Sequence, residues 1–437
     1  MNKISGWGRY PRVNVTEGFP ESEEELIKIT ENHSDSFIAR GNGRSYGDSA
    51  INRNLTINMK KFNKIIEFNV KDGSLVAESG VLISDVIKTF MPKGWFPFVT
   101  AGTKYVTLGG AIACDIHGKN HHSDGSFGNH VNWFEILNSE NKIIRCAPDK
   151  NSDLFFWTIG GMGLTGIITK CSIKLKKIEN GWISQKVIVN NSLDETLNSF
   201  YDNDNSSYSV AWLDCLSKKK NFGRSVLILG EHAKNEQILN QENLFPKFPK
   251  QILSMPFNFP SFILNNVFIS FFNNIYFFLH RKQKSSIVHW DKYFYPLDFI
   301  KDWNRLYGKK GFFQFQCVLP LDKSKKGLSE LLNIIQNESS GSFLAVLKKF
   351  GEGNGYLSFP RDGFTLALDF KISKKNILAA KKLTNVVSKF NGSIYLAKDS
   401  LLHSSDFEQM IGKEKISDFQ KLINKKCISE QSIRLKL

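Results

Sequence analysis

The stretch that decides how this chain is interpreted covers residues 96–131 and reads FPFVTAGTKYVTLGGAIACDIHGKNHHSDGSFGNHV. It holds six glycines and four histidines. Glycine lets backbone N–H groups approach a ligand where a Cβ would clash, and a run of such groups binds anionic oxygens, typically those of a pyrophosphate. The histidine spacing fits none of the usual metal patterns. The stretch therefore predicts a site for a diphosphate-bearing cofactor, and the alternative is a glycine-rich surface loop.

Two further glycine-rich segments flank this stretch. Residues 39–49 (ARGNGRSYGDS) lie upstream, at the end of a short apolar run, and residues 160–168 (GGMGLTGII) lie downstream. Neither segment matches the Rossmann fingerprint, which needs G-x-G-x-x-G between a strand and a helix. Neither contains the G-K-[ST] of a P-loop. The glycine-rich segments by themselves do not name the cofactor.

Three motifs together carry a resemblance to a known family. They are RGNGRSYGD at residues 40–48, TLGGA at 107–111 leading to HGKN at 117–120, and GGMGLTG at 160–166. The set resembles the FAD-linked oxidases of the vanillyl-alcohol oxidase superfamily. Within that superfamily it is most similar to the decaprenylphosphoryl-β-D-ribose 2′-oxidases, the flavin half of the epimerases that make lipid-linked arabinose. The resemblance extends over residues 6–435, nearly the whole chain.

The expected fold class is α+β. Helical and strand-like patterns alternate over the first 175 residues, with helical patterns at residues 21–31 and 82–90 and a strand at 75–80. The resemblance implies the two-domain vanillyl-alcohol oxidase-type fold, in which a FAD-binding domain joins a substrate domain with an antiparallel sheet. It divides the chain into a first part of the FAD-binding domain (1–177), a substrate-binding domain (178–390) and a C-terminal return to the FAD-binding domain (391–437).

The resemblance implies that the glycine-rich segments bind FAD. Many relatives attach the flavin covalently through a histidine at the end of the first glycine motif, and Arg44 stands at that position here. The flavin is therefore expected to be held without a covalent bond. The expected cofactor contacts are Trp7, Arg40, Gly41, Asn42, Gly43, Arg44, Ser45, Tyr46, Gly47, Gly102, Thr107, Leu108, Gly109, Gly110, Cys114, Asp115, Ile116, His117, Gly118, Ile167 and Tyr395.

Polar residues are embedded in apolar strands of the expected substrate domain. Gln314 and Gln316 alternate within residues 312–320, which places both on one face of a strand. Asp369 is similarly embedded in an apolar run. By the resemblance, Gln316 and Lys348 line a sugar-phosphate pocket. Lys119 and Lys348 would neutralise a phosphodiester.

Oxidation of a secondary alcohol by a flavin requires transfer of hydride to N5 and loss of the hydroxyl proton. The candidate catalytic residues are Lys398, His117 and Tyr46, and the sequence leaves open which group takes the proton. The resemblance places Tyr395 and Lys398 beside the flavin ring, at the end of an expected strand at residues 393–397. The alternative is that Lys398 is a solvated lysine at a strand end.

The leading expectation is FAD-dependent oxidation of a polyprenyl-phosphoryl pentose, similar to decaprenylphosphoryl-β-D-ribose, at C2′ to the 2′-keto sugar. This would be the first half of an epimerisation to the arabinose form, completed by a short-chain reductase, with a quinone or other electron acceptor. One alternative is an oxidase of a soluble sugar, alditol or aldonolactone, whose typical members carry the histidine that Arg44 replaces. Another is a catalytically silent membrane-surface binding protein, which the intact catalytic set disfavours.

Residues 262–279 (FILNNVFISFFNNIYFFL) carry no charge. On a helix, one half of this stretch is wholly apolar, whereas the asparagines gather on the other half. The stretch is barely long enough to span a membrane, and its asparagine pairs disfavour spanning. It is flanked by basic residues: Lys247, Lys250, Arg281, Lys282 and Lys284. The pattern indicates a helix in the membrane interface, and the alternative is a core helix of the substrate domain.

The 437 residues carry a formal net charge of +16, which indicates an anionic partner such as a phosphate ligand or an acidic membrane surface. There is no zinc-finger spacing, RNP-type strand or long Lys/Arg run, so nucleic acid is not expected. The six cysteines show no C-x-x-C spacing, which favours a reducing compartment. The N-terminus has no apolar secretory segment. The expected location is therefore cytoplasmic, in peripheral association with the inner membrane.

Overall fold

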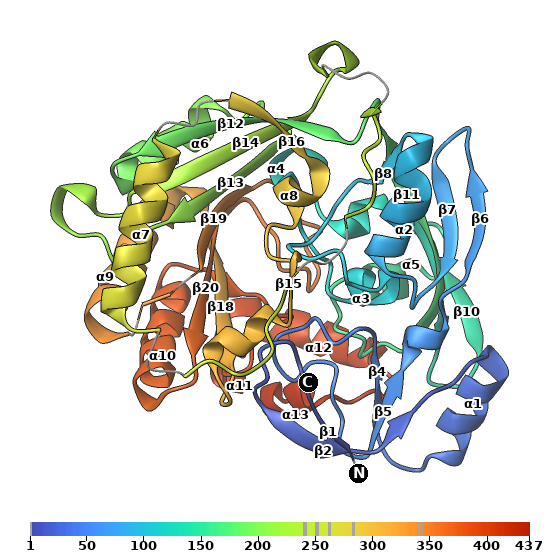
Figure 1. The fold of residues 1–437 in the computed structure, drawn as a ribbon. Helices are drawn as coiled ribbons and strands as arrows, with labels where there is room; N and C mark the ends of the chain where they lie inside the picture. The colour runs from blue at the N-terminus through green and yellow to red at the C-terminus, as the bar shows by residue number, and fades with distance from the viewer. Residues whose placement is uncertain are drawn as a thin grey trace.

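The computed structural model shows an α+β protein built around a six-stranded and an eight-stranded sheet (Figure 1). The structure describes residues 2–238, 243–249, 253–260, 264–281, 285–339, 341–342 and 344–437. Both large sheets are antiparallel, and helices cover them. The α+β class and the two-domain architecture predicted from the sequence are confirmed.

The six-stranded sheet is formed by the first part of the chain. Its strands are β6 (Ile65–Asn69), β7 (Ser74–Glu78), β8 (Trp95–Pro97), β9 (Val131–Leu137), β10 (Ile143–Cys146) and β11 (Ile167–Lys177). They are ordered β10-β9-β11-β7-β6, with β8 paired to the far end of β11. Helices α2 (Ile83–Phe90), α3 (Leu108–Ala113) and α5 (Ser152–Thr158) share its core. Helix α2 forms where the sequence predicts it, because its apolar residues recur at helical spacing and are buried.

A small parallel sheet leads directly into the first glycine-rich segment, which begins at the end of one of its strands. Its strands are β3 (Glu17–Gly18), β4 (Phe37–Arg40) and β5 (Leu55–Asn58), in the order β3-β5-β4. Helix α1 (Glu23–Asn32) precedes β4, and the Ser22 side chain caps it by accepting a hydrogen bond from the Glu25 N–H. A hairpin of β1 (Asn2–Ser5) and β2 (Arg12–Val15) leads into this sheet.

The eight-stranded sheet carries the residues that the sequence assigns to substrate binding. Its strands are β12 (Trp182–Asn190), β13 (Tyr208–Leu213), β14 (Ser225–His232), β16 (Ser285–His289), β18 (Phe312–Leu319), β19 (Ala345–Phe350), β20 (Gly363–Lys371) and β21 (Ser393–Ile394). Their order is β16-β12-β14-β13-β19-β20-β18-β21. Helices α6 (Leu193–Asp202), α9 (Leu321–Glu338) and α10 (Lys374–Lys389) pack on one face in a continuous core.

Alternate residues of each strand face opposite sides of the sheet, so only every second side chain lies in that core. In β18, Phe313 and Phe315 are buried against the covering helices, whereas Gln314 and Gln316 project to the opposite face. The same alternation in β20 places Asp369 beside Gln314, its directly paired neighbour. The predicted strand at residues 312–320 and the shared face of the two glutamines are thus present in the structure.

The predicted strand at residues 393–397 is shorter than expected. Ser393 and Ile394 form the ladder with β18, and the Tyr395 N–H donates to the Gln316 carbonyl of β18 at 2.9 Å. The chain then turns, with the Lys398 N–H donating to the Tyr395 carbonyl at 3.0 Å. The turn forms because Ala397 accepts a hydrogen bond from the Tyr46 N–H of the first glycine-rich segment instead of continuing the ladder. Lys398 therefore lies in a turn rather than at the end of a long strand.

The C-terminal segment packs back onto the beginning of the chain (Figure 1). It contains α11 (Ser404–Ile411), α12 (Lys413–Leu422) and α13 (Glu430–Leu435). Phe37 of β4 forms a bridge with Cys427, and Arg434 pairs with Asp48 at 2.8 Å and with Asp399 at 3.0 Å. The domain boundaries at residues 177 and 390 stay predictions.

Helix α7 (Asn266–His280) occupies most of the uncharged stretch, and its first turn is capped by Asn265. Phe262 and the flanking Lys250, Lys282 and Lys284 lie outside the described residues. The helix packs across β12 and β14, and its apolar half is exposed. Exposed fractions reach 80% for Val267, 64% for Phe271, 61% for Phe278 and 59% for Leu279. The stretch is therefore not an ordinary core helix.

The polar half of α7 is the half that faces the protein. Asn273 is 1% exposed and donates to Asp214 at 2.7 Å, and Asn274 accepts a hydrogen bond from Arg224. Asparagines bury readily when they are hydrogen-bonded. Among the described helices, we find none whose length and apolar character suffice to cross a bilayer.

Candidate active site

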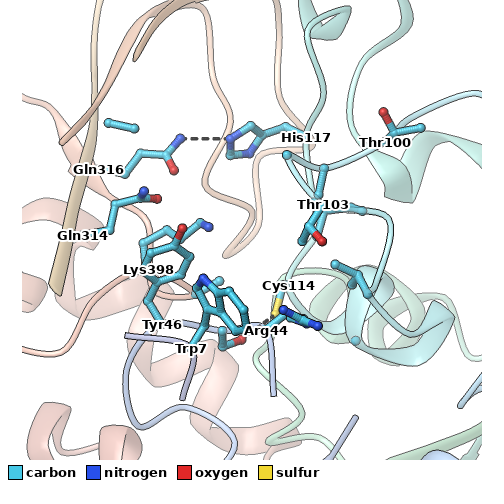
Figure 2. Close-up of a pocket in the computed structure, with 18 of the residues that line it drawn as sticks. Trp7, Arg44, Tyr46, Thr100, Thr103, Cys114, His117, Gln314, Gln316 and Lys398 are labelled. Carbon is cyan, nitrogen blue, oxygen red and sulfur yellow. Dashed lines mark hydrogen bonds between the residues drawn. The ribbon is translucent and has the colours of Figure 1, made fainter. Parts of the chain in front are cut away.

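A cavity of about 880 Å³ lies between the glycine-rich segments and the inner face of the eight-stranded sheet (Figure 2). Segments far apart in sequence meet on its wall, including the 40–47 loop, the α3 region, β18, β20 and the turn at residue 398. The predicted site residues that line it are Trp7, Arg40, Gly41, Asn42, Gly43, Arg44, Ser45, Tyr46, Gly47, Gly102, Thr107, Gly109, Gly110, Cys114, Ile116, His117, Gly118, Lys119, Gln316, Lys348, Tyr395 and Lys398.

Three predicted cofactor contacts do not line the cavity. Leu108 and Ile167 are buried in the hydrophobic core, because they fall on the inward faces of α3 and β11. Asp115 is fully buried in a turn, where its carboxylate accepts hydrogen bonds from the Gly128 N–H at 2.8 Å and from the Ser358 hydroxyl. The structure therefore gives these three residues a supporting role behind the wall.

The glycine side of the cavity is closely packed. A Cβ added at Gly41 would lie 2.2 Å from Oγ1 of Thr107, so the first loop fits only without a side chain there. Gly43 has a φ of +63°, a conformation that favours glycine. The side chain of Asn42 donates to the Tyr105 carbonyl at 2.8 Å and joins this loop to the central stretch. The two glycine-rich segments thus form one wall.

Arg44 lies between two aromatic rings at the edge of this wall. Its guanidinium carbon is 4.1 Å from the centroid of the Trp7 ring and 5.3 Å from that of Tyr105. Its buried Nε finds no hydrogen-bond partner within the described part of the chain. Burial lowers the pKa of Arg44 from its ordinary value, although arginine remains charged. A buried, unpaired cationic donor is suited to an anionic or polar ligand.

His117 and Gln316 form a buried pair across the cavity, and Figure 2 shows the two side chains pointing toward each other. Gln316 Nε2 donates to His117 Nε2 at 2.9 Å and to Thr365 Oγ1 at 3.2 Å. Since Nε2 of the imidazole accepts, its proton resides on Nδ1, which has no hydrogen-bond partner among the described residues. Burial lowers the pKa of His117 well below its ordinary value, so the ring is neutral.

Lys398 faces Tyr46 at the floor of the cavity (Figure 2). Its Nζ lies 3.8 Å from the centroid of the Tyr46 ring. Burial lowers the pKa of Lys398, and the nearby Asp369 carboxyl opposes that shift. Asp369 accepts hydrogen bonds from Gln314 at 2.5 Å and from the Tyr307 hydroxyl at 3.4 Å, and burial raises its pKa. The lysine can therefore exchange a proton near neutral pH.

Two further lysines converge on the cavity from opposite elements. Lys119 follows α3 in the chain, and its Nζ donates to the Tyr293 carbonyl and lies 4.2 Å from the centroid of that ring. Lys348 projects from β19. Burial lowers the pKa of each lysine to about 7; the neighbouring charge of Lys348 adds to the shift of Lys119, and that of Lys398 to the shift of Lys348. Burying several cations close together is unfavourable without a counter-charge, so these lysines are suited to binding an anionic ligand.

Tyr395 and Cys114 complete the wall near these groups. The Tyr395 hydroxyl donates to the Cys114 carbonyl at 2.8 Å, and its ring centroid is 5.0 Å from that of His117. The Cys114 thiol lies 3.7 Å from Oγ of Ser45. Burial raises the pKa of Cys114 to about 11, so the thiol is protonated and a weak nucleophile.

The other three histidines of the central stretch have structural contacts. His121 Nδ1 accepts from the Gly351 N–H at 3.2 Å, His122 is hydrogen-bonded to the Ser206 carbonyl, and His130 stacks on Phe98. These contacts attach α4 (His121–Asp124) and its neighbouring turns to the sheets. Of the four histidines, His117 is the one on the cavity wall.

Sequence reasoning missed one side of the cavity. The segment from α8 (Trp290–Phe294) to residue 307 covers it, and Lys104 ties this segment to the central stretch. The Nζ of Lys104 is 2.5 Å from Asp291 and 3.8 Å from Asp298, and the lysine is 2% exposed. The aromatic pattern of this segment resembles that of ordinary core. The segment contains no recognisable cofactor or catalytic motif, and the buried ion pair in the structure reveals its placement.

Comparisons with known proteins agree with this geometry. The FAD binding domain family matches residues 18–147. Decaprenylphosphoryl-beta-D-ribose oxidase of Mycolicibacterium smegmatis is 36% identical over 421 residues, which cover 93% of this chain and 91% of that protein. Cytokinin dehydrogenase 2 of Arabidopsis thaliana is 27% identical over 153 residues, 34% of this chain and 30% of that protein.

The fold and the cavity define a FAD-dependent oxidoreductase of the two-domain, vanillyl-alcohol oxidase type. Its cavity provides glycine walls that admit backbone contacts and an unpaired buried donor at Arg44, so the residues present fit FAD. Within this class, the chain belongs to the family of the decaprenylphosphoryl-β-D-ribose oxidases.

The flavin should leave the protein intact when the chain is denatured with acid or heat. The family resemblance implies that Arg44 stands where a histidine would form a covalent bond, and burial keeps the nearby Cys114 thiol protonated. Fluorescence of the supernatant after precipitation measures the released FAD, and a Cys114→Ser variant serves as the control. Fluorescent flavin that stayed with the precipitated polypeptide would refute non-covalent binding.

Proposed function

We propose that this enzyme oxidises a polyprenyl-phosphoryl pentose, a decaprenylphosphoryl-β-D-ribose-like lipid, at C2′ to the 2′-keto sugar. The observation that carries the proposal is the convergence of Lys119 and Lys348 beside the His117–Gln316 pair. The lysines suit a phosphodiester, and the uncharged pair next to them suits the hydroxyl groups of a sugar. The likeness to a protein named for this activity supports the assignment.

In the proposed reaction the C2′–H bond breaks, the hydroxyl proton leaves, and a C=O bond forms. Bound FAD supplies the hydride acceptor. Lys398 is suited to accept the proton, because burial lowers its pKa and so increases the neutral fraction. His117 cannot use Nε2 as the base while Gln316 donates to it, and we assign it the orientation of the sugar through its Nδ1–H. The Tyr46 ring lies next to Lys398 Nζ and would stabilise the ammonium that forms when the lysine accepts the proton.

A keto sugar made in this way is a suitable substrate for a subsequent reduction. We propose that a short-chain reductase reduces the ketone from the opposite face and so completes an epimerisation to lipid-linked arabinose, a step in cell-wall or glycan biosynthesis. Electrons leave the enzyme through a quinone or another acceptor. The likeness to a decaprenylphosphoryl-beta-D-ribose oxidase supports the lipid-linked sugar with which this sequence of steps begins.

Anaerobic titration tests the proposed oxidation directly. Farnesylphosphoryl-β-D-ribose, added to the holoenzyme without an electron acceptor, should bleach the visible flavin absorbance and yield the 2′-keto sugar in equal amount. Soluble alditols and aldonolactones serve as the comparison. Bleaching by those compounds but not by the lipid-linked ribose would replace the proposal with a soluble-sugar oxidase. No bleaching by any of them would favour the silent binding protein.

We also propose that the enzyme lies in the cytoplasm, against the inner membrane, and that α7 forms the contact. The exposed side chains Val267, Phe268, Phe271, Ile275, Phe278 and Leu279, here called the α7 apolar face, form the apolar half of this helix. Large apolar side chains exposed along one helix face mark an interaction surface. The six free cysteines are compatible with a reducing compartment.

Basic residues lie at the end of α7 and on a hairpin that contacts this helix. Arg224 of the hairpin between β13 and β14 donates to Asn274 of α7 at 2.7 Å, which fixes this hairpin beside the helix. At the tip of the hairpin, Lys218, Lys219 and Lys220 are exposed, and Arg281 is exposed at the end of α7. Each basic residue near an anionic lipid surface contributes roughly 1 kcal/mol. At an anionic membrane, this surface would therefore combine burial of apolar side chains in the lipid with attraction of the basic residues to the head groups.

Wild-type protein should co-sediment with anionic vesicles, and Phe268→Ser combined with Phe271→Ser should weaken that binding at both low and high salt. Area burial is not screened by salt. Neutralising the three hairpin lysines with glutamine should weaken binding at low salt only. Flavin content measured on the same samples confirms that the variants fold. Wild-type protein that stayed wholly in the supernatant would exclude the membrane contact.

A further inference from the structure

The cavity continues beyond the lysines along the inner face of the eight-stranded sheet. Gln316 of β18 pairs directly with Ala367 of β20, Ala367 with Val346 of β19, and Val346 with Trp212 of β13. Directly paired residues of neighbouring strands project to the same face of a sheet. All four residues line the cavity. They form a row that leads from the His117–Gln316 pair to the far half of the sheet.

The chemistry of the wall changes along this row. At its beginning, β18 and β20 present Gln314, Gln316 and Asp369. At its far end, β13 and β14 present Val210, Trp212 and Ile228, with Val210 and Ile228 directly paired. Gln185 of β12 is the polar exception among the far strands' lining residues. The wall is therefore polar near the catalytic groups and mainly apolar away from them.

Helix α7 closes the far end with its inner edge. Phe272 and Tyr276, one turn apart, line the cavity and stack with ring centroids 6.0 Å apart. The Tyr276 ring is 4.7 Å from that of Trp212, and Phe277 is buried with Trp212. The next residue before Phe272 is Phe271, which belongs to the α7 apolar face. One helix thus borders the cavity on its inner edge and presents apolar side chains on its outer side.

We propose that Val210, Trp212, Ile228, Phe272 and Tyr276, here called the apolar arm, bind the first isoprene units of the substrate's lipid chain. The inference rests on the proposed function. The occupant follows from continuity: a ligand with an anionic phosphate at Lys119 and Lys348 reaches the apolar arm within the same cavity. A phosphate ester with an apolar chain satisfies both ends of this wall. Beyond α7, the rest of the chain passes to the α7 apolar face.

Binding of short prenyl phosphates to the holoenzyme, in buffer free of vesicles and detergent, tests the apolar arm without turnover. The probes are methyl, dimethylallyl, geranyl and farnesyl phosphate, followed by calorimetry or by perturbation of the flavin spectrum. Burial of one CH₂ group strengthens binding about fourfold. We expect affinity to rise at least tenfold from methyl to geranyl phosphate, because a few carbons of the chain then lie in the arm.

Two adjacent phenylalanines provide a matched pair of variants. Phe272→Ser, on the cavity wall, should reduce the ratio of geranyl to methyl phosphate affinity at least fivefold and leave the affinity for methyl phosphate unchanged. Phe271→Ser, on the outer side of the same helix, should keep the wild-type ratio in this vesicle-free assay. A second wall variant, Ile228→Gln, should act like Phe272→Ser from a different element, which keeps the test valid if one variant misfolds.

The outcomes separate the apolar arm from the proposed function. Equal affinity for all four phosphates, or an equal loss in the Phe271→Ser and Phe272→Ser variants, would overturn the arm. The apolar arm would be supported if affinity rises with chain length in the wild-type protein and this rise is reduced in the Phe272→Ser variant. If that series appeared while farnesylphosphoryl-β-D-ribose failed to bleach the flavin, the proposed oxidation would fail and the prenyl-phosphate site would stand.

Discussion

Replacement of Lys398 by alanine should lower turnover of a lipid-linked ribose by roughly a hundredfold or more while FAD stays bound. The Lys398 Nζ lies over the Tyr46 ring at 3.8 Å, on the wall that it shares with His117 and Gln316. A preorganised group at the place where charge develops typically contributes a hundred- to a thousandfold to the rate. Steady-state reduction of an artificial electron acceptor measures kcat, and the visible spectrum measures bound flavin.

The variant Lys398→Arg distinguishes two roles of this residue. Arginine keeps the positive charge but does not give up its proton, because its pKa lies above 12. If Lys398 accepts the hydroxyl proton, the arginine variant should be almost as slow as the alanine variant. If Lys398 only stabilises a developing alkoxide, arginine should restore much of the rate. An alanine variant with normal turnover would show instead that Lys398 takes no part in the reaction.

Replacement of Lys348 by methionine should raise KM for the lipid-linked ribose roughly ten- to a hundredfold with little change in kcat. Methionine retains much of the side-chain volume but removes the cation. A hydrogen bond to a charged group contributes about 1.5–3 kcal/mol, and the phosphate keeps its charge throughout the reaction, so its contact serves binding. A matched control is Lys349→Met, because Lys349 pairs with Asp204 at 2.7 Å on the other face of β19. A Lys348→Met enzyme with wild-type KM would place the phosphate elsewhere.

The pH dependence of KM should report the same lysines. Burial lowers the pKa of Lys348 and of Lys119 to about 7, so each side chain is cationic below that pH and neutral above it. The phosphodiester of the substrate keeps its single negative charge throughout this range. KM should therefore rise as the pH increases from about 6 to 9. The rise should become shallower in Lys348→Met, since one titrating cation is removed.

The lowered pKa of Lys348 also affects the stability of the folded protein. A lysine whose pKa is about 7 in the folded chain and 10.5 in the unfolded chain binds its proton more weakly when folded. Between these pH values the unfolded state holds more protons, so this group lets the stability of the ligand-free protein rise with pH. The buried lysines thus oppose folding near neutral pH. That cost is consistent with residues retained for binding an anion.

Much of the cofactor side could be predicted from the sequence because the glycine motifs are local. A segment such as RGNGRSYGD specifies close backbone approach wherever it folds, and Gly41 and Gly43 each lack the space or the φ for a side chain. Strand alternation is equally local, so the shared face of Gln314 and Gln316 followed from their spacing alone. The positions of Leu108 and Ile167 behind the cavity wall have a matching cause. They lie inside or next to motifs, but their side chains point to the core.

The sequence by itself determined a diphosphate-binding class of cofactor site and the α+β fold class, because short-range backbone and side-chain chemistry encodes them, and its family resemblance supplied the catalytic candidates. Only the tertiary structure decided which charges meet. Lys119 and Lys348 converge from different elements, and their lowered pKa values arise from burial that no sequence window contains. It also decided the orientation of α7. An amphipathic pattern defines two faces, but Asp214 and Arg224, distant in sequence, bind the asparagines and so turn the phenylalanines outward.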